Sequence, residues 1–254
     1  MSLLANRVPD GGNQFWRANP DPVVRMSPRV QNPSAASQPV ARSEALPDLS
    51  FLSRMSLNPE RGYSDENLAD AASALGASVI LIKTVIEVET PRGAFEASSG
   101  RPTILFERHY FSELAGRRYD IEYPSISNRV RGGYDKYSAQ YPKLESAFAL
   151  DKSAALKSAS WGAFQIMGRN HLAAGHATVE DFVLALTRSE AAHLTAFTAF
   201  VIDSPAINRA LRERDWAGFA RRYNGPAYRD NAYDTKLKEA YDRNVAAAAP
   251  PARR

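Results

Sequence analysis

Apolar residues recur at spacings of three and four along most of the chain beyond residue 64, which is the pattern of helices with one buried face. The first helix is expected from an N-cap at Ser64 through Leu75, where Gly76 can end it. A second helix is expected from Ser78 to Glu89. The ordered part of the chain is therefore predicted to begin with two helices joined by a short turn.

A short strand-like run follows, and the rest of the chain returns to helical spacing. Residues 100–107 read GRPTILFE and predict a β element, with loops as far as Tyr141. Helices are then expected over 143–157, around 162–167, after a Thr178 N-cap, along the face of Leu194, Phe197 and Val201, between an Asp215 N-cap and Gly225-Pro226, and from Tyr233 to Tyr241. The predicted fold class is mainly α, a helical domain with one small β element.

The first 60 residues differ from the rest in composition, because they hold eight of the 16 prolines. Proline lacks a backbone donor and interrupts helices, so residues 1–60 are predicted to be a disordered tail or linker. Two apolar spots, Val23-Val24 and Leu49 to Leu52, leave open whether this tail docks on a partner or on the main domain. Residues 61–247 are predicted to form the folded domain, and residues 248–254 a disordered end.

Composition excludes several classes of site and of protein. The chain has no cysteine, so disulfides, thiolate catalysis and cysteine-based zinc sites are excluded. No apolar run approaches the ~20 residues of a membrane-spanning helix, and the N-terminus lacks the pattern of a secretory signal peptide. We therefore expect no stable membrane insertion, and action outside the cytoplasm would follow release or export by another route.

The charge balance is mildly basic, with a net charge of +4 and a pI of about 9.3. A solvated basic surface is the plainest interpretation, and attraction to an anionic polymer is the functional one. Nucleic acid and the bacterial cell wall both fit such a charge. No block of five Lys or Arg residues is present, which weakens the nucleic-acid hypothesis.

Glu89 is the carboxylate whose position best suits acid catalysis. On the predicted helix it ends an apolar stripe that includes Ile82 and Val85, whereas Glu87 points about 200° away and can pair with Lys83. A carboxyl group held against apolar side chains pays desolvation in its charged form, so its pKa rises, as the acid of a glycosidase requires. Spacing alone leaves open that Glu89 only ends the helix.

Residues 158–168, SASWGAFQIMG, combine small residues, aromatic rings and an amide. Small residues allow a polymer to approach the backbone, Trp161 and Phe164 offer flat faces for sugar rings, and Gln165 offers both a donor and an acceptor. Core packing is the alternative, and it is favoured for Phe164 and Ile166 taken alone. The amide of Gln165 is harder to explain as part of a core.

Two further positions have a structural and a functional interpretation. Glu107 follows three apolar residues and should be partly buried, so it either pairs with a cation such as Arg108 or serves as a second active-site carboxylate. Tyr223 and Asn224 precede Gly225 at a predicted helix end, where Asn and Gly are usual capping residues.

The remaining motifs remove support for other chemistries. The four histidines form no HExxH pair and their spacing suggests no metal cage, so neither a metal nor an organic cofactor is expected. No G-x-S-x-G, P-loop or G-x-G-x-x-G motif is present, which leaves serine hydrolases and nucleotide enzymes without support. The histidines concerned are His109, His171, His176 and His193.

Four stretches, VIEVETPRGAF, GRPTILFERHYF, ALKSASWGAFQIMGRNH and ARRYNGPAYRDNAYDTKL, occur in an order that resembles the N-acetylmuramidase domain of phage endolysins of Gram-negative hosts. The resemblance covers residues 64–243, nearly all of the chain predicted to be ordered. It implies the lysozyme-like α+β fold shared with goose-type lysozymes and soluble lytic transglycosylases. The Pro-rich tail departs from this pattern, because such endolysins often carry a peptidoglycan-binding module ahead of the muramidase.

The resemblance also implies roles for individual residues. In this group the catalytic glutamate ends a helix and is followed by Ser or Thr, which Glu89-Thr90 matches. The motif that lines the sugar groove matches Gly162 to Gln165, and a Tyr-Asn motif at a later helix end matches Tyr223-Asn224. The predicted substrate-binding residues are Trp161, Gly162, Phe164, Gln165, Tyr223 and Asn224.

The predicted reaction is hydrolysis of the β-1,4 bond from N-acetylmuramic acid to N-acetylglucosamine, with Glu89 protonating the leaving oxygen. Inversion would need a second carboxylate about 6.5–9.5 Å away, for which Glu107 is the candidate. A lytic transglycosylase would use the same acid, with the muramic 6-hydroxyl as nucleophile and a 1,6-anhydro product. The partner expected in either case is the glycan strand of peptidoglycan, bound by a monomer in the periplasm.

Two alternatives belong to other classes of protein. One is a non-catalytic protein that binds the cell wall and uses the tail as its partner site. The other is a basic helical protein that binds nucleic acid, which predicts binding with a steep salt dependence and leaves Glu89 without a role.

Overall fold

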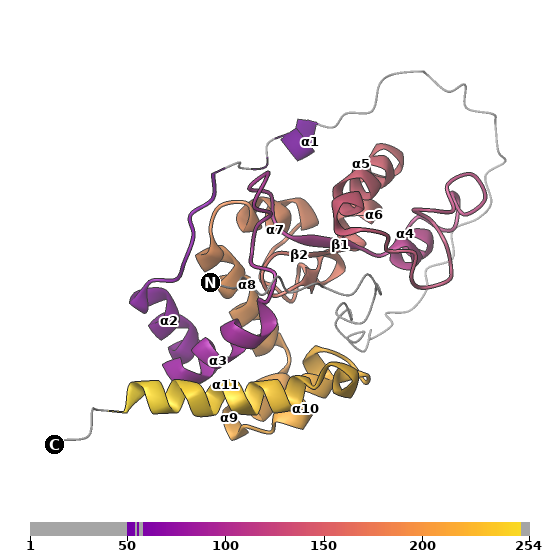
Figure 1. Ribbon diagram of the computed structural model, residues 1–254. Helices are drawn as coiled ribbons and strands as arrows, with labels where there is room; N and C mark the ends of the chain where they lie inside the picture. Colours follow the sequence, from indigo (N-terminus) through magenta and orange to yellow (C-terminus); the bar gives the residue numbers. More distant parts are fainter. Residues whose placement is uncertain (1–49, 54, 56–57, 250–254) are drawn as a thin grey trace, which may run out of the picture.

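Helices surround a small three-stranded sheet in the computed structural model, which describes residues 50–53, 55 and 58–249 (Figure 1). The helices are α1 (Ser50–Ser53), α2 (Asp65–Leu75), α3 (Val79–Glu89), α4 (Arg108–Leu114), α5 (Gln140–Leu150), α6 (Lys152–Lys157), α7 (Val179–Leu186), α8 (Glu190–Asp203), α9 (Pro205–Glu213), α10 (Trp216–Tyr223) and α11 (Tyr233–Ala248). The strands are β1 (Ile104–Phe106), β2 (Ala159–Trp161) and β3 (Ile166–Met167), and the 3-10 turns are η1 (Tyr137–Ala139), η2 (Gly168–Asn170) and η3 (Tyr228–Asn231). The predicted fold class, mainly helical with one small β element, is confirmed.

The predicted helix ends are confirmed where a polar side chain or a glycine forms the cap. Ser64, Thr178 and Asp215 each accept a hydrogen bond from the backbone N–H three residues further on, at 3.1, 3.0 and 2.9 Å. Gly76 ends α2 with a left-handed φ of +60°. These contacts are local, and they satisfy donors and acceptors that a helix leaves free at its ends.

The sheet includes a segment predicted from the sequence to be helical. Strand β2 pairs antiparallel with β1 on one side and with β3 on the other, where Trp161 stands opposite Ile166. The prediction of a helix around 162–167 is wrong, because Gly162 and Gln165 have φ values of +71° and +50°. These left-handed values reverse the chain between β2 and β3 instead of continuing a right-handed helix.

Two other helical predictions need correction. The helix predicted over 143–157 is divided at Asp151, which is extended with a φ of −154° and accepts a hydrogen bond from Ala154 N at 3.0 Å, so that it caps α6. The region predicted to be loops as far as Tyr141 contains α4 and part of α5. Helix α9, which was not predicted, begins at Pro205, where a missing backbone donor costs nothing.

The short helix α1 belongs to the main apolar core. Phe51 and Leu52 are 7% and 8% exposed, and the ring of Phe51 stacks on that of Phe148 in α5 with 5.9 Å between centroids. The buried structure therefore begins before residue 60, the predicted end of the tail. The rest of that tail, including Val23-Val24, lies outside the described residues.

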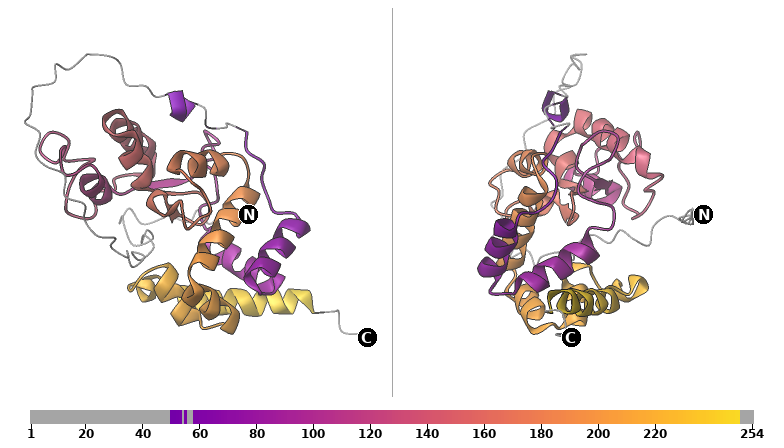
Figure 2. Two further views of the ribbon diagram at one scale, coloured as in Figure 1. Left: turned by 180° about the vertical axis from the view of Figure 1, so that it is seen from behind. Right: turned by 60° about the vertical axis from the view of Figure 1, so that its left-hand side comes forward.

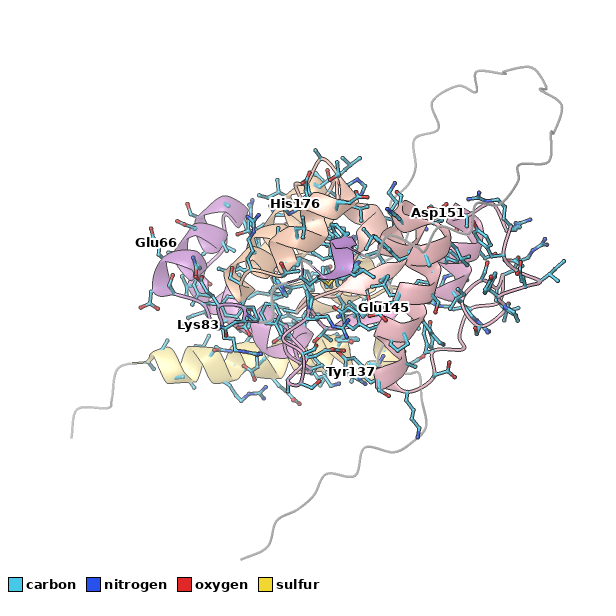
Figure 3. The ribbon with its side chains drawn as sticks, turned by 90° about the horizontal axis from the view of Figure 1, so that it is seen from above. Glu66, Lys83, Tyr137, Glu145, Asp151 and His176 are labelled. Atoms are coloured by element: carbon cyan, nitrogen blue, oxygen red, sulfur yellow. The ribbon has the colours of Figure 1, made fainter. Side chains whose placement is uncertain are left out.

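The helices form two groups on either side of the sheet. Helix α11 lies along α3 and beside α9 and α10, at the end of the molecule opposite α1 (Figures 1 and 2). Helix α8 contacts both α2 and α7 and so links the two groups. Seen from above, Glu66 of α2 and Lys83 of α3 lie on the side opposite Asp151, which precedes α6 (Figure 3).

We expect Phe51→Ala to lower the free energy of unfolding by about 3 kcal/mol, because loss of a buried ring leaves a cavity. Urea denaturation would measure this change. The control is Glu239→Ala, at an exposed position of α11, with an expected change of no more than about 0.5 kcal/mol. An unaltered midpoint for Phe51→Ala would show that the contact between α1 and α5 does not contribute to stability.

Candidate active site

Glu89 is the last residue of α3 and is buried, with 8% of its surface exposed. The helix brings it there below Ile82 and Val85, neither of which is exposed at all. Thr90 closes the helix, because both its backbone N and its Oγ1 donate to Ile86 O, at 3.2 and 2.7 Å. The apolar stripe predicted from spacing therefore places the carboxyl group where it is largely shielded from water.

Asn224 holds this carboxyl group from the end of another helix. Its Nδ2 donates to Glu89 Oε1 at 3.0 Å, and its backbone N donates to Ala220 O at 2.8 Å to close α10. Asn224 is 6% exposed, so the amide and the carboxyl group are buried together. The predicted capping role of Asn224 is present in the structure, its contact with Glu89 is an addition to it, and substrate binding by Asn224 stays a prediction.

Burial is the dominant influence on the acidity of Glu89. Burial raises the pKa of Glu89 from 4.5 to about 7, although the hydrogen bond from Asn224 and the positive charge of Lys236 lower it. Tyr233 lies near enough that burial and then the Glu89 charge raise the pKa of its phenol. Lys236 and Tyr233 both belong to the first turn of α11. Around neutral pH, Glu89 is therefore divided between a proton-donating form and a charged form.

Glu87 is on a different side of α3, as predicted, but its partners come from α11. Arg243 Nη2 and Asn244 Nδ2 both reach the Glu87 carboxylate, at 2.6 and 2.9 Å. The side chain of Glu87 is 41% exposed. The predicted pairing with Lys83 is wrong, because Glu87 pairs instead with Arg243, and this contact joins α11 to α3.

Tyr223 connects the end of α10 to the turn between β2 and β3. Its hydroxyl donates to Phe164 O at 2.9 Å, and its ring stacks on Phe219 with 5.4 Å between centroids. The residue is 2% exposed. Tyr223 therefore supports the position of its neighbour Asn224, and its own ring is packed inside the protein.

The turn between β2 and β3 is fixed by His193 of α8. His193 Nδ1 accepts a hydrogen bond from Ala163 N at 2.9 Å, and Nε2 lies 2.6 Å from Leu186 O, so the ring is neutral with its proton on Nε2. Burial lowers the pKa of His193 to about 4. A Cβ on Gly162 would lie 2.5 Å from His193 Nδ1, which explains why glycine stands there.

Gln165 uses its amide inside the same turn. Its Oε1 accepts from Ser160 Oγ at 2.7 Å, and its Nε2 donates to Gly162 O at 2.7 Å and to Thr103 O at 3.2 Å. Both amide protons are thereby occupied by backbone carbonyls. The difficulty of explaining Gln165 as core is resolved, because the turn itself supplies its partners.

The aromatic rings expected to face sugars are buried. Trp161 is 1% exposed and its Nε1 donates to Leu156 O at 3.0 Å. Phe164 is 3% exposed and stacks on Phe197 with 4.5 Å between centroids. The prediction that Trp161 and Phe164 offer flat faces to a sugar is wrong, because both rings are packed in the core.

Glu107 directly follows β1, and its partners are not those of Glu89. It is 1% exposed, accepts from the Tyr134 hydroxyl at 3.1 Å, and lies 3.1 Å from His109 Nδ1. Its backbone N bonds Ser158 O, at the end of the β1–β2 pair opposite the turn that Tyr223 contacts. Its burial beside His109, and not beside Arg108, favours the structural interpretation, and a role as second carboxylate stays a prediction.

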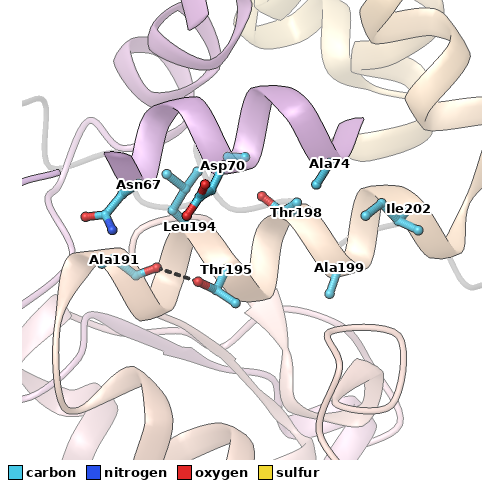
Figure 4. Close-up of a pocket in the computed structure, with 10 residues that line it drawn as sticks. Asn67, Asp70, Ala74, Ala191, Leu194, Thr195, Thr198, Ala199 and Ile202 are labelled. Carbon is cyan, nitrogen blue, oxygen red and sulfur yellow. Dashed lines mark hydrogen bonds between the residues drawn. The ribbon is translucent and has the colours of Figure 1, made fainter. Parts of the chain in front are cut away.

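Three further features concern the part of the chain that the structure describes. No group of three or more His, Asp or Glu side chains placed to hold a metal ion occurs in this part of the chain. A pocket of about 350 Å³ lies between α2 and α8, lined by alanines together with Asn67, Asp70 and Thr198, and it contains none of the predicted site residues (Figure 4). Within residues 50–53, 55 and 58–249, no single helix is long and apolar enough to cross a membrane, and α2 with α3 meets that test only as a pair bent by 104°.

Comparison with known proteins identifies the family of the chain. A model of the N-acetylmuramidase family matches residues 78–244, which is more than half of the chain. The chain belongs to this family. The crystal structure of the Burkholderia AP3 phage endolysin is 42% identical in sequence, with a TM-score of 0.70, over 79% of this chain and 76% of that one. Comparison with curated proteins returned no match.

As a muramidase, the protein is a peptidoglycan-lytic enzyme, and peptidoglycan is its substrate. The family model covers every residue discussed in this site, from Glu89 to Lys236. Tyr233, Lys236 and His193 were not predicted as part of the site. No sequence signal marks them, because their relation to Glu89 or to Gly162 arises only when distant helices pack.

We expect the muramidase variant Glu89→Gln to be more stable than the wild type at neutral pH. Between pH 4.5 and 7 the folded chain keeps a proton on Glu89 that the unfolded chain has lost, so wild-type stability falls as pH rises through this window. Glutamine carries no such cost. The difference in unfolding free energy should be near zero at pH 4 and about 3 kcal/mol at pH 8, as measured by urea denaturation. A difference that does not vary with pH would contradict the raised pKa, and Glu87→Gln is the exposed control.

We expect Gly162→Ala to cost the muramidase about 3 kcal/mol of stability, because the new methyl group meets the His193 ring and the backbone is left-handed. Gly116→Ala is the matched control. Its φ of +63° is equally left-handed, but no atom lies within 4 Å of an added Cβ, so it measures backbone strain alone, about 1 kcal/mol. Equal losses in thermal or urea unfolding would rule out the close packing of His193.

Proposed function

We propose that this muramidase hydrolyses the β-1,4 bond between N-acetylmuramic acid and N-acetylglucosamine, with Glu89 as the general acid. The observation that carries the proposal is the buried carboxyl group at the end of α3, whose pKa is raised to about 7 by burial. Such a group still carries its proton in mildly acidic to neutral solution and can give it to the leaving glycosidic oxygen.

Asn224 supports this role by positioning the acid. Because its Nδ2 occupies Oε1 of Glu89, the proton to be donated resides on Oε2. As the glycosidic bond breaks, the proton moves from Oε2 to the leaving oxygen, and the bond electrons remain with that oxygen. The oxocarbenium-like sugar is then captured by water, which returns a proton to Glu89. The amide of Asn224 stabilises the carboxylate in the interval, because a hydrogen bond favours the charged form.

A lytic transglycosylase is the second candidate function. The surroundings of Glu107 support this candidate. Glu107, the predicted second carboxylate, is enclosed with Tyr134 and His109. We therefore do not assign Glu107 as a base that activates water. A site with a single acid suits attack by the muramic 6-hydroxyl, which needs no separately held water. The two reactions differ in product and not in the role of Glu89.

The test is digestion of purified peptidoglycan by the wild type and by Glu89→Gln, with fragments identified by mass spectrometry. Glutamine keeps the size and the Asn224 contact but removes the proton, so activity should fall at least about a hundredfold. Reducing muramic ends would identify a hydrolase, and 1,6-anhydro ends a transglycosylase. A fully active Glu89→Gln variant would exclude Glu89 as the acid, and a folded wild type that binds but does not cleave would support the wall-binding alternative.

The pH dependence of the wild type gives an independent check. Activity should decline on the alkaline side of about pH 7, because a general acid must be protonated and Glu89 loses its proton there. Initial rates from pH 4 to 9 would measure this limb. A decline in activity centred near pH 4.5 would contradict a catalytic acid whose pKa is raised by burial.

A further inference from the structure

The pocket of about 350 Å³ between α2 and α8 is lined by residues of these two helices alone. Its residues from α2 share one helical face, because they are spaced by three and four positions. They are Asn67, Asp70, Ala71 and Ala74. Figure 4 shows this face turned toward α8, with Asn67 at one end of the row and Ile202 near the other. The volume is within the range of roughly 300–1,000 Å³ that small-ligand sites occupy.

The hydroxyl group of Thr198 has no hydrogen-bond partner among the described residues, although Thr198 is only 8% exposed. A threonine in a helix can donate to the carbonyl four residues before it. Thr195 does so to Ala191 O at 3.0 Å, and Thr84 does so to Ile80 O at 2.8 Å. Thr198 instead lines the pocket and is directed from α8 toward α2 (Figure 4). Because a buried hydroxyl without a partner is unfavourable, a ligand that bonds to it gains affinity.

Acidic side chains dominate the charge of the two helices that form the pocket. Helix α2 has three acidic residues and α8 has two, and neither helix contains Lys or Arg, in a chain whose net charge is +4. Asp70 is exposed and has no hydrogen-bond or ion-pair partner in the part of the chain that the structure describes. Arg212 lies beside Gly76, after the end of α2, and does not line the pocket. The pocket therefore offers an unpaired carboxylate to a cation.

The remaining lining restricts which cation fits. Leu194 is 2% exposed and Ile202 is 48% exposed, and the other members are mostly alanines, so an aliphatic chain would be shielded from water here. An ammonium group has three donors that point in different directions, which suits oxygen acceptors supplied by two helices. A planar guanidinium group pairs best with both oxygens of one carboxylate. The lining thus favours an ammonium group on an aliphatic chain.

We propose that the pocket between α2 and α8 binds a primary ammonium group carried on a short aliphatic chain. Asp70 binds the ammonium group, Thr198 accepts one of its hydrogen bonds, and Leu194 and Ile202 contact the chain. A free aliphatic diamine carries this chemistry, and so does the diamino acid in a stem peptide of peptidoglycan. The inference goes beyond the proposed function, because Glu89 does not line this pocket.

The first test is an NMR titration of the full chain with pentan-1-amine at low salt. Pentan-1-ol is the neutral probe of equal length. We expect the amine to bind with a Kd of about 1 mM, and the alcohol to bind at least about tenfold more weakly, because it cannot pair with Asp70. Equal binding of the amine and the alcohol would overturn the proposal.

Two variants test the contacts of the ammonium group. Asp70→Asn removes the charge and Thr198→Val removes the hydroxyl at nearly constant shape, and each should weaken binding of the amine about fivefold. Glu66→Gln is the matched control, because it removes one exposed charge from α2 outside the lining and should change the Kd by less than about twofold. Equal losses in Asp70→Asn and Glu66→Gln would overturn the pocket in favour of a general attraction to acidic helices.

Urea denaturation keeps the result for Thr198→Val interpretable. Loss of an unpartnered buried hydroxyl should raise the urea midpoint, so weaker binding by this variant would not reflect unfolding. A lower midpoint would show that the hydroxyl already has a partner in the free protein, which would also contradict the proposal.

Sedimentation with purified peptidoglycan distinguishes the two sources of the ammonium group. The chain used is Glu89→Gln, and the wall material is compared before and after acetylation of its amines. Acetylation makes the wall more anionic, so a general attraction to this basic chain would strengthen. Weaker sedimentation after acetylation, and equally with Asp70→Asn, would identify the stem peptide as the ligand.

Sedimentation that does not weaken on acetylation, together with binding of pentan-1-amine that Asp70→Asn weakens, would identify a free amine. Failure of both the amine and the wall amines to bind would overturn the proposal. None of these measurements depends on cleavage, so a failure of Glu89 as the acid would leave them unchanged.

Discussion

The hydrogen bond from Asn224 to Glu89 is the contact on which the arrangement of the site depends, because it joins side chains 135 residues apart in the sequence. The helix α3 alone would leave a carboxyl group among apolar side chains with nothing to orient it. The end of α10 supplies the orienting amide, and Tyr223, one residue earlier, ties that end to the turn between β2 and β3. One helix end therefore positions the acid and the sheet relative to each other.

Burial and hydrogen bonding act on Glu89 in opposite directions, and burial is the stronger. Glu107 has different surroundings within the same chain. It is at least as buried, but a tyrosine hydroxyl and a histidine lie beside its two oxygens.

The parts of the fold that could be predicted are those set by neighbours in the sequence. Ser64, Gly76, Thr178 and Asp215 act within three residues of their own positions, and the stripe above Glu89 depends only on helical period. The reversal at Gly162 could not be predicted, because its left-handed φ and the approach of His193 arise from packing against α8. The burial of Trp161 and Phe164 also depends on contacts with distant parts of the chain, and so do the partners of the Gln165 amide.

The position of α1 has a consequence for how this enzyme can be combined with other domains. Helix α1 packs on α5, whereas Glu89 at the end of α3 contacts Asn224 at the end of α10 and lies near the first turn of α11. A module fused ahead of α1 would therefore be attached beside α5 and not beside α10 or α11 (Figures 1 and 2). Such a chimera would hold its second ligand from a surface other than the one formed by α10 and α11, so targeting and catalysis could be engineered separately.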